Sequence, residues 1–154
     1  MSDKCREKDW RGMIRIAHDF FHQWRGTVAE VVDEQTRQAM ELRFWERVGE
    51  TTADAFRRLA PASLKAIVDL MARSSAIMGE EVVTREEGEA CFLVHMACPW
   101  LASYRRSGLR GSCRPGCDRW FVATLAALRV PYRVETLSSL ADGDATCTRR
   151  FTPK

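Results

Sequence analysis

The segment EVVTREEGEACFLVHMACPW, residues 81–100, decides the fold class, because two runs of strand-forming residues surround a glycine and end at a proline. The runs 81–85 and 89–97 predict a β-hairpin that turns at Gly88. The second run is apolar on both faces, which predicts a central strand of a sheet. Since proline is favoured at the first position of a helix, a helix is expected to begin directly after Cys98.

Before this hairpin, the chain has the spacing of amphipathic helices. Apolar residues recur at every third or fourth position over 10–24, and Gly26 is expected to end this helix. A second helix is predicted from an N-cap at Thr27 to a break or bend at Gly49, and further helical turns are predicted on both sides of Pro61. The N-terminal half is therefore expected to be helical.

After the hairpin, the pattern predicts further helix followed by a second hairpin. A glycine-rich loop precedes a helix from about Cys117 to Leu128, on which Cys117 is expected to point inwards. Strand-like runs at 132–140 and 145–151 then flank a turn, and Cys147 is expected to point towards the core.

This order of elements predicts a single α+β domain over residues 1–154. It divides into a helical half, 1–79, and a cysteine-bearing sheet half, 80–154. In the second half a β-hairpin, two helices and a second β-hairpin are expected to form an antiparallel sheet of about four strands. A hydrophobic content of 45% suits one core in a chain of this length.

The charge balance excludes some classes of function. A net charge of +3 arises from 24 basic and 21 acidic residues, so neither nucleic acid nor a membrane is expected as a partner. The segment 1–9 is rich in charged residues, where a secretory signal would be apolar. No apolar run reaches the roughly 20 residues of a membrane span. The prediction is a cytoplasmic protein of small-molecule metabolism or biosynthesis. Its six cysteines are then expected to be free thiols, metal ligands or nucleophiles rather than disulfides.

Cys98, Cys117 and Cys147 are the main candidates for chemistry. The first two stand at expected helix starts, where the macrodipole favours an ionised thiol. The two hairpins are expected to bring all three cysteines to one end of the sheet. Three interpretations stay open: a thiolate nucleophile with supporting groups, a zinc site ligated by these three residues, or small buried apolar side chains. The cofactor is accordingly none or zinc.

Neighbouring side chains are candidates to assist these thiols. His95, at the end of the central strand, is predicted to be a base, a ligand or a hydrogen-bonded core histidine. Asp118 would carry a proton, or would only complement the helix dipole. Arg105 and Arg114 are candidates to clamp a substrate carboxylate. They belong to an arginine-rich segment that also contains Arg106, Arg110 and Arg119.

Two histidines of the first helix form a weaker pattern. His18 and His22 are four residues apart, which places both rings on one helix face. This is a two-ligand geometry for a metal, and a pair of histidines bordering the core is the alternative.

Three short motifs together resemble a known family. They are Cys98-Pro99, Cys117-Asp118, and Gly143-Asp144-x-x-Cys147 leading into Arg150-Phe151. Over about 90–151 this pattern resembles the L-2-amino-thiazoline-4-carboxylic acid hydrolase family. The Gly-Asp-x-x-Cys ending is also similar to 4-vinyl reductase domains, small-molecule-binding modules in which cysteines and a glutamate can hold zinc. Here Glu135 would supply the carboxylate, whereas Ser138 and Ser139 stand where that resemblance implies another cysteine.

The hydrolase resemblance implies that water opens a ring containing sulfur and nitrogen at its C=N carbon. It implies Cys117 as the nucleophile, with Asp118 or His95 as the proton carrier and an arginine on the substrate carboxylate. Cys98 and Cys147 would lie beside the pocket. The alternative is a small-molecule-binding or sensor module whose cysteines ligate zinc or serve structure. Under either interpretation, the long first helices are candidates for a homodimer interface.

Overall fold

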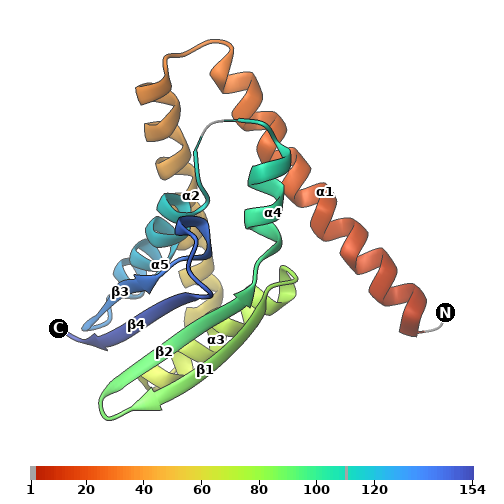
Figure 1. The fold of residues 1–154 in the computed structure, drawn as a ribbon. Helices are drawn as coiled ribbons and strands as arrows, with labels where there is room; N and C mark the ends of the chain where they lie inside the picture. Colours follow the sequence, from red (N-terminus) through yellow and green to blue (C-terminus); the bar gives the residue numbers. More distant parts are fainter. Residues whose placement is uncertain (1–2, 110) are drawn as a thin grey trace.

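The computed structural model describes residues 3–109 and 111–154, with side chains described from residue 6 onward except at position 110. Its elements follow the order predicted for an α+β fold (Figure 1). They are α1 (Asp3–Ala29), α2 (Glu34–Arg57), α3 (Leu64–Ile77), β1 (Glu81–Glu87), β2 (Ala90–Ala97), α4 (Pro99–Arg106), α5 (Arg114–Leu128), β3 (Tyr132–Ser138), the 3₁₀ turn η1 (Leu140–Asp142) and β4 (Cys147–Pro153). None of the helices in this described part is both long enough and apolar enough to cross a membrane.

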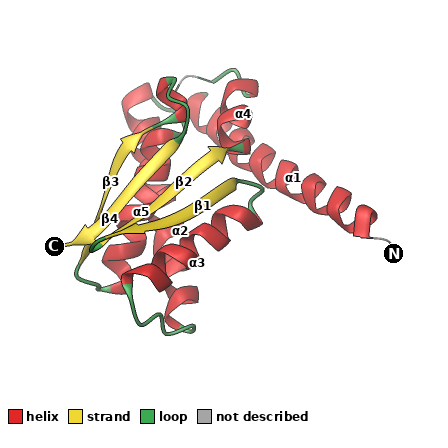
Figure 2. Ribbon diagram, turned by 60° about the horizontal axis from the view of Figure 1, so that its bottom comes forward, coloured by secondary structure: helices red, strands yellow, loops and turns green. Residues whose placement is uncertain are grey.

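The described strands form one antiparallel sheet in the order β1-β2-β4-β3. β2 and β4 are therefore central, which confirms the prediction from the apolar run 89–97. They pair in a register that places His95 opposite Cys147. Figure 2 shows α2, α3 and α5 behind the sheet, while α1 extends away from it. On the covered face, alternate β4 residues Cys147, Arg149 and Phe151 are all buried.

The main core lies between the sheet and helices α3 and α5. Its most enclosed side chains are no more than 2% exposed, and they are Ile67, Val68, Met71, Leu93, Phe121 and Phe151. Burying each such side chain contributes about 1.5–3 kcal/mol, so this cluster fixes the two central strands against the helices.

The boundary between α1 and α2 differs from the prediction. α1 continues through Gly26 to Ala29, because Arg25 and Val28 on either side of the glycine are buried against the rest of the protein. That packing offsets the roughly 1 kcal/mol that a glycine costs inside a helix. The N-cap of α2 is Asp33 rather than Thr27, and its carboxylate accepts the Thr36 N–H at 2.8 Å.

Gly49 does not break α2, which passes through it without interruption. A Cβ at this position would lie 2.8 Å from the Cβ of Ala123 and 2.8 Å from the carbonyl oxygen of Trp120. The glycine therefore permits the close approach of α2 and α5. The side chain of Thr124 also reaches this point, where its hydroxyl donates to the Gly49 carbonyl at 3.4 Å.

Gly49→Ala is expected to destabilise the protein by about 1–3 kcal/mol, because the added methyl overlaps backbone and cannot be accommodated by a side-chain rotation. The matched control is Gly26→Ala, whose added Cβ meets nothing within 4 Å among the described atoms. The control should be neutral or should stabilise by up to about 1 kcal/mol. Urea unfolding of both variants measures the difference, and equal midpoints would contradict the packing argument.

α5 also begins earlier than predicted, at Arg114, with Cys113 as the N-cap and Pro115 within the first turn. Proline suits this position because it lacks the N–H that a first turn leaves unpaired. Cys117 therefore completes the first turn instead of starting the helix.

Candidate functional site

A cavity of about 200 Å³ lies where α2, α3, α4 and α5 meet the inner face of the central strands. Much of its wall is aromatic, from Trp45, Trp100, Trp120 and Phe121. The polar and sulfur-bearing side chains of the wall include Ser75, Glu80, His95, Cys98, Cys113, Arg114, Cys117, Ser139, Cys147 and Arg149. The cavity thus combines apolar surfaces with a cluster of reactive groups, as is typical of a small-molecule site.

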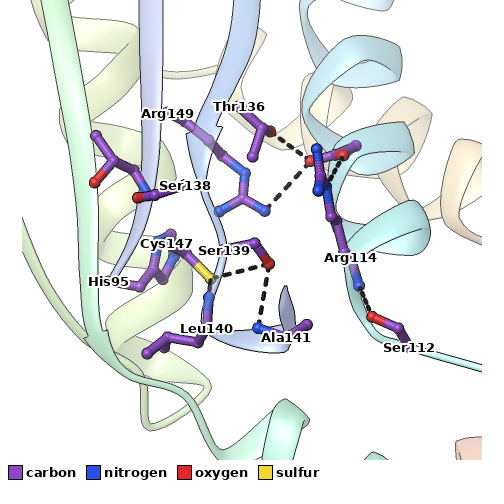
Figure 3. A network of polar contacts seen from close by, with 12 residues as sticks. His95, Ser112, Arg114, Thr136, Ser138, Ser139, Leu140, Ala141, Cys147 and Arg149 are labelled. Carbon is purple, nitrogen blue, oxygen red and sulfur yellow. Dashed lines mark hydrogen bonds and ion pairs between the residues drawn. The ribbon is translucent and has the colours of Figure 1, made fainter. Parts of the chain in front are cut away.

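His95 and Cys147 form a cross-strand pair in this wall. They are opposite each other in the β2–β4 register, so both side chains stand on the same face, with Cβ atoms about 4.5–5.5 Å apart. Both are buried, at 4% and 8% exposed. In Figure 3 the contacts drawn from Sγ of Cys147 run to the Leu140 N–H and the Ser139 hydroxyl. A thiol and a potential base are therefore neighbours in register on rigid strands rather than on a loop.

Glu80 lies beside the imidazole of His95. Its Oε2 is 2.8 Å from Nε2 of His95, and the Ser75 hydroxyl is 3.2 Å from the same nitrogen. When Nε2 carries the hydrogen that faces this carboxylate, Nδ1 keeps its lone pair. Nδ1 is buried and has no hydrogen-bond partner among the described residues. The ring is thereby oriented with a free basic nitrogen.

The Gly143-Asp144-x-x-Cys147 motif builds the environment of the sulfur. Gly143 has φ +98°, and the Asp144 carboxylate accepts the Ser139 N–H at 2.7 Å, which closes the turn around η1. This turn aims the Leu140 N–H at Sγ of Cys147, with 3.2 Å between nitrogen and sulfur (Figure 3). A backbone donor at that distance favours the negative charge of a thiolate.

Arg149 places a buried guanidinium beside the thiols. It is 2% exposed and lies 4.7 Å above the ring of Phe121. Burial lowers the pKa of Arg149, but Cys117, Asp118 and Cys147 outweigh it and raise that pKa above its ordinary value. Its Nε has no hydrogen-bond partner among the residues that the structure describes. The group therefore remains a cation at the cavity wall.

Asp118 contributes through Arg149 rather than through the cavity. Its Oδ1 accepts the Thr136 hydroxyl at 2.6 Å and lies 3.4 Å from a terminal nitrogen of Arg149 (Figure 3). The cavity wall does not include this carboxylate among its described residues. Asp118 thus orients the guanidinium and is poorly placed to carry a proton.

The structure gathers most of the predicted site residues. Those that line the cavity are Cys98, Cys117, Cys147, His95 and Arg114. Arg105 is exposed on the last turn of α4 and does not line it, which is a correction. Arg110 lies outside the described residues.

Sequence reasoning missed Glu80, Arg149 and the aromatic wall. For Arg149 a signal existed, because it alternates with Cys147 and Phe151 on one strand and must share their face. Glu80 gave no such signal, since it becomes a neighbour of His95 only through the turn between α3 and β1.

The expected lowering of thiol pKa at helix starts is wrong. Burial, Glu80 and Cys117 raise the pKa of Cys98 to about 12. A hydrogen bond with Cys113, together with burial, holds the pKa of Cys117 well above its usual range despite the opposing charge of Arg149. The backbone N–H groups of Trp100 and Leu101 at the start of α4 do lower the pKa of Cys98, but burial outweighs them. Cys117 lies one turn inside α5, where the macrodipole is weaker.

The arrangement of side chains does not support a zinc site at Cys98, Cys117 and Cys147. Among the described side chains, those of 6–109 and 111–154, no group of three or more His, Cys, Asp or Glu residues is arranged to hold a metal ion. Glu135, the carboxylate implied by the second resemblance, instead pairs with Arg150 at 2.6 Å on the exposed face of the sheet.

His18 and His22 both serve the packing of α1. His22 Nε2 is 2.9 Å from the Ser103 hydroxyl on α4. His18 is stacked on Trp100, with 3.7 Å between ring centroids, so it supports one wall of the cavity from behind. Burial, followed by the charges of His22 and Arg106, lowers the pKa of His18 to about 4.

Acid is therefore expected to destabilise the protein through His18. The folded state resists protonation of the His18 ring. The contribution of neutral His18 to the free energy of unfolding is therefore complete above pH 6.5, the ordinary pKa, and is lost as the pH falls towards 4. The slope approaches 1.4 kcal/mol per pH unit, or about 3 kcal/mol in all. His18→Asn should flatten this part of the profile in urea unfolding at graded pH. Parallel profiles for the two proteins would contradict the assignment.

Two solved structures share the fold of this chain. No curated protein matches the chain. The phenol-responsive sensory domain of the transcription activator PoxR, solved with phenol, has a TM-score of 0.63 at 10% identity, over 88% of this chain and 74% of that one. A trafficking protein particle complex subunit 3 from Naegleria fowleri, covalently bound to palmitic acid, has a TM-score of 0.62 at 12% identity, over 91% and 96%. At these identities the likeness shows a shared fold.

A family match covers more of the chain than the three short motifs at 98–151. The model of one family matches residues 13–151, which include the helical half as well as the cavity. The chain belongs to the L-2-amino-thiazoline-4-carboxylic acid hydrolase family.

Proposed function

We propose that the protein hydrolyses a C–N bond in a small carboxylated heterocycle, with Cys147 as the nucleophile. One observation carries the proposal: Cys147 and His95 are cross-strand partners, and Glu80 lies 2.8 Å from Nε2 of His95, which leaves Nδ1 to accept a hydrogen bond when the thiol turns towards it. Nucleophile, base and orienting carboxylate in this order are the arrangement that activates a thiol. Cys117, which the hydrolase resemblance implied, has no such pair of imidazole and carboxylate among the described residues, and its raised pKa keeps it protonated.

The reaction follows from these positions. Nδ1 of His95 takes the thiol proton, and Sγ adds to the C=N carbon while the π electrons move to nitrogen, which receives that proton. The C–N bond then breaks as the lone pair of the other nitrogen on this carbon forms a new C=N bond. The departing nitrogen takes, through His95, the proton that this other nitrogen gives up, and the carbon stays attached to sulfur. Water adds to this carbon and releases the Cys147 thiol, so that one water is consumed in each turnover. The Leu140 N–H stabilises the thiolate before attack.

The size and lining of the cavity support a single-ring substrate. A cavity of about 150 Å³ holds benzene, whereas drug-sized ligands occupy about 300–1,000 Å³. The 200 Å³ here suits one ring with a substituent. Aromatic walls suit a planar ring, and the guanidinium of Arg149 would bind its carboxylate.

The direct test is turnover of L-2-amino-thiazoline-4-carboxylic acid and of a panel of carboxylated five-membered heterocycles, followed by mass spectrometry. A product heavier by one water is expected, together with a covalent adduct on the Cys147 peptide in rapidly quenched samples. Absence of any product across the panel, in protein that is folded and reduced, would contradict the proposal.

A ligand-sensing or binding module is the second candidate. It is supported by the likeness to the phenol-responsive sensory domain and by a cavity of the size of one aromatic ring. A sensor should gain thermal stability from a small phenol or aromatic acid without chemical change. Cys147→Ser should leave that binding intact, whereas it should stop a hydrolase.

A further inference from the structure

Helix α1 presents two apolar faces, and in the described structure one of them is buried while much of the other is exposed. Ile14, Phe21 and Val28 are buried against the protein. Met13, Ile16 and Phe20, on another face, are 58%, 48% and 72% exposed. Residues at these spacings form one stripe along a helix. Figures 1 and 2 both show α1 extending beyond the body of the protein, so the stripe is accessible.

The exposed stripe continues onto α2. Trp24 follows Phe20 by one turn and stacks on Phe44, with ring centroids 5.3 Å apart. Phe44 and its neighbour Met40, one turn away, are 36% and 40% exposed. The result is a contiguous apolar surface on two helices, which we call the α1–α2 patch. It consists of Met13, Ile16, Phe20, Trp24, Met40 and Phe44.

We propose that the α1–α2 patch binds a second copy of this chain, with the two α1 helices antiparallel around a two-fold axis near Ile16. An isologous contact requires a surface that is complementary to itself. Gly12 supplies a notch, because a Cβ there would meet nothing within 4 Å. In an antiparallel pair centred near Ile16, Phe20 of one copy lies over Gly12 of the other.

The charges beside the stripe favour the same occupant. Arg15 and Asp19 lie on one flank, with Nε and Oδ2 3.8 Å apart and both side chains more than half exposed. In an antiparallel helix pair, equivalent flanks face each other. Arg15 of each copy then lies near Asp19 of the other, so the charges are complementary across the axis. A flank with both signs of charge is less suited to an anionic membrane surface.

The test is the molar mass of the reduced protein over a range of concentrations, by light scattering and by sedimentation. The wild type is expected to be a dimer that dissociates on dilution. Phe20→Asp is expected to be monomeric at every concentration. The control is Leu59→Asp, which replaces a side chain 60% exposed outside the patch and should leave the dimer intact. Circular dichroism establishes that both variants are folded.

Ile16→Cys tests the position of the axis. Mild oxidation should join two copies through this residue, as seen in the mapped peptides. A wild-type monomer at all concentrations, or a dimer that survives Phe20→Asp, would overturn the proposal. Failure of Ile16→Cys to cross-link would overturn the two-fold arrangement, and wild-type binding to anionic vesicles without dimerisation would assign the patch to a membrane surface instead.

Discussion

Cys147→Ser is expected to lower turnover of the heterocyclic substrate by about a thousand-fold or more, because the hydroxyl is a far weaker nucleophile beside the same base. Cys117→Ser should lower it by less than about tenfold, equivalent to 1.4 kcal/mol. The substitution is nearly isosteric in both cases. Cys147 is 8% exposed and its sulfur accepts one backbone hydrogen bond, which a serine can also accept. Thermal unfolding should therefore change little.

Alkylation provides an independent measurement on the same thiols. Iodoacetamide at neutral pH should modify Cys147 before Cys98 and Cys117, whose raised pKa values keep them protonated. His95→Gln should slow alkylation of Cys147 and lower turnover together, because the base is lost. If Cys117→Ser abolished turnover while Cys147→Ser kept it, the nucleophile would be Cys117, as the sequence alone suggested.

The parts of the fold that were predictable from sequence depend on local patterns. The segment 81–97 folds as the hairpin it predicts, because strand periodicity and a glycine at φ +60° are properties of neighbouring residues. Gly26 and Gly49 were misjudged because their roles depend on other helices. At Gly49 the deciding fact is the presence of Trp120 and Ala123, which no local pattern records.

The same distinction explains the candidate site. Cys98, Cys117 and Cys147 all reach the cavity, as the predicted order of elements required. Their relative reactivity depends on contacts made after folding, which no local pattern in the sequence records. Cys117 gains a cysteine neighbour and loses water, whereas Cys147 gains an imidazole across the strand and a backbone donor from the turn. The Gly-Asp-x-x-Cys motif thus forms the turn that surrounds its own last residue, Cys147.

Loss of the Glu41 charge is expected to have the largest effect on stability. The Glu41 carboxylate joins three helices, and its side chain is only 12% exposed. Oε1 lies 2.9 Å from Nε of Arg25 on α1, accepts the Tyr104 hydroxyl of α4 at 2.9 Å, and Oε2 pairs with Arg37. Arg25 is fully buried, so removing its partner leaves a cation in a medium that solvates it poorly.

Glu41→Gln should therefore cost about 3–5 kcal/mol, or roughly 10 °C in Tm. Glu46→Gln, which breaks an exposed ion pair with Arg43 on the same helix, is the matched control and should cost much less, because water screens that pair. Equal losses in the two variants would show that Glu41 is not the anchor of α4. Because α4 also carries Trp100 into the cavity wall, Glu41→Gln should weaken substrate binding as well, raising KM at temperatures where the variant is still folded. Cys147→Ser is expected to lower turnover and leave stability unchanged, whereas Glu41→Gln is expected to lower stability and raise KM. This contrast would separate the residues that react from those that hold the cavity together.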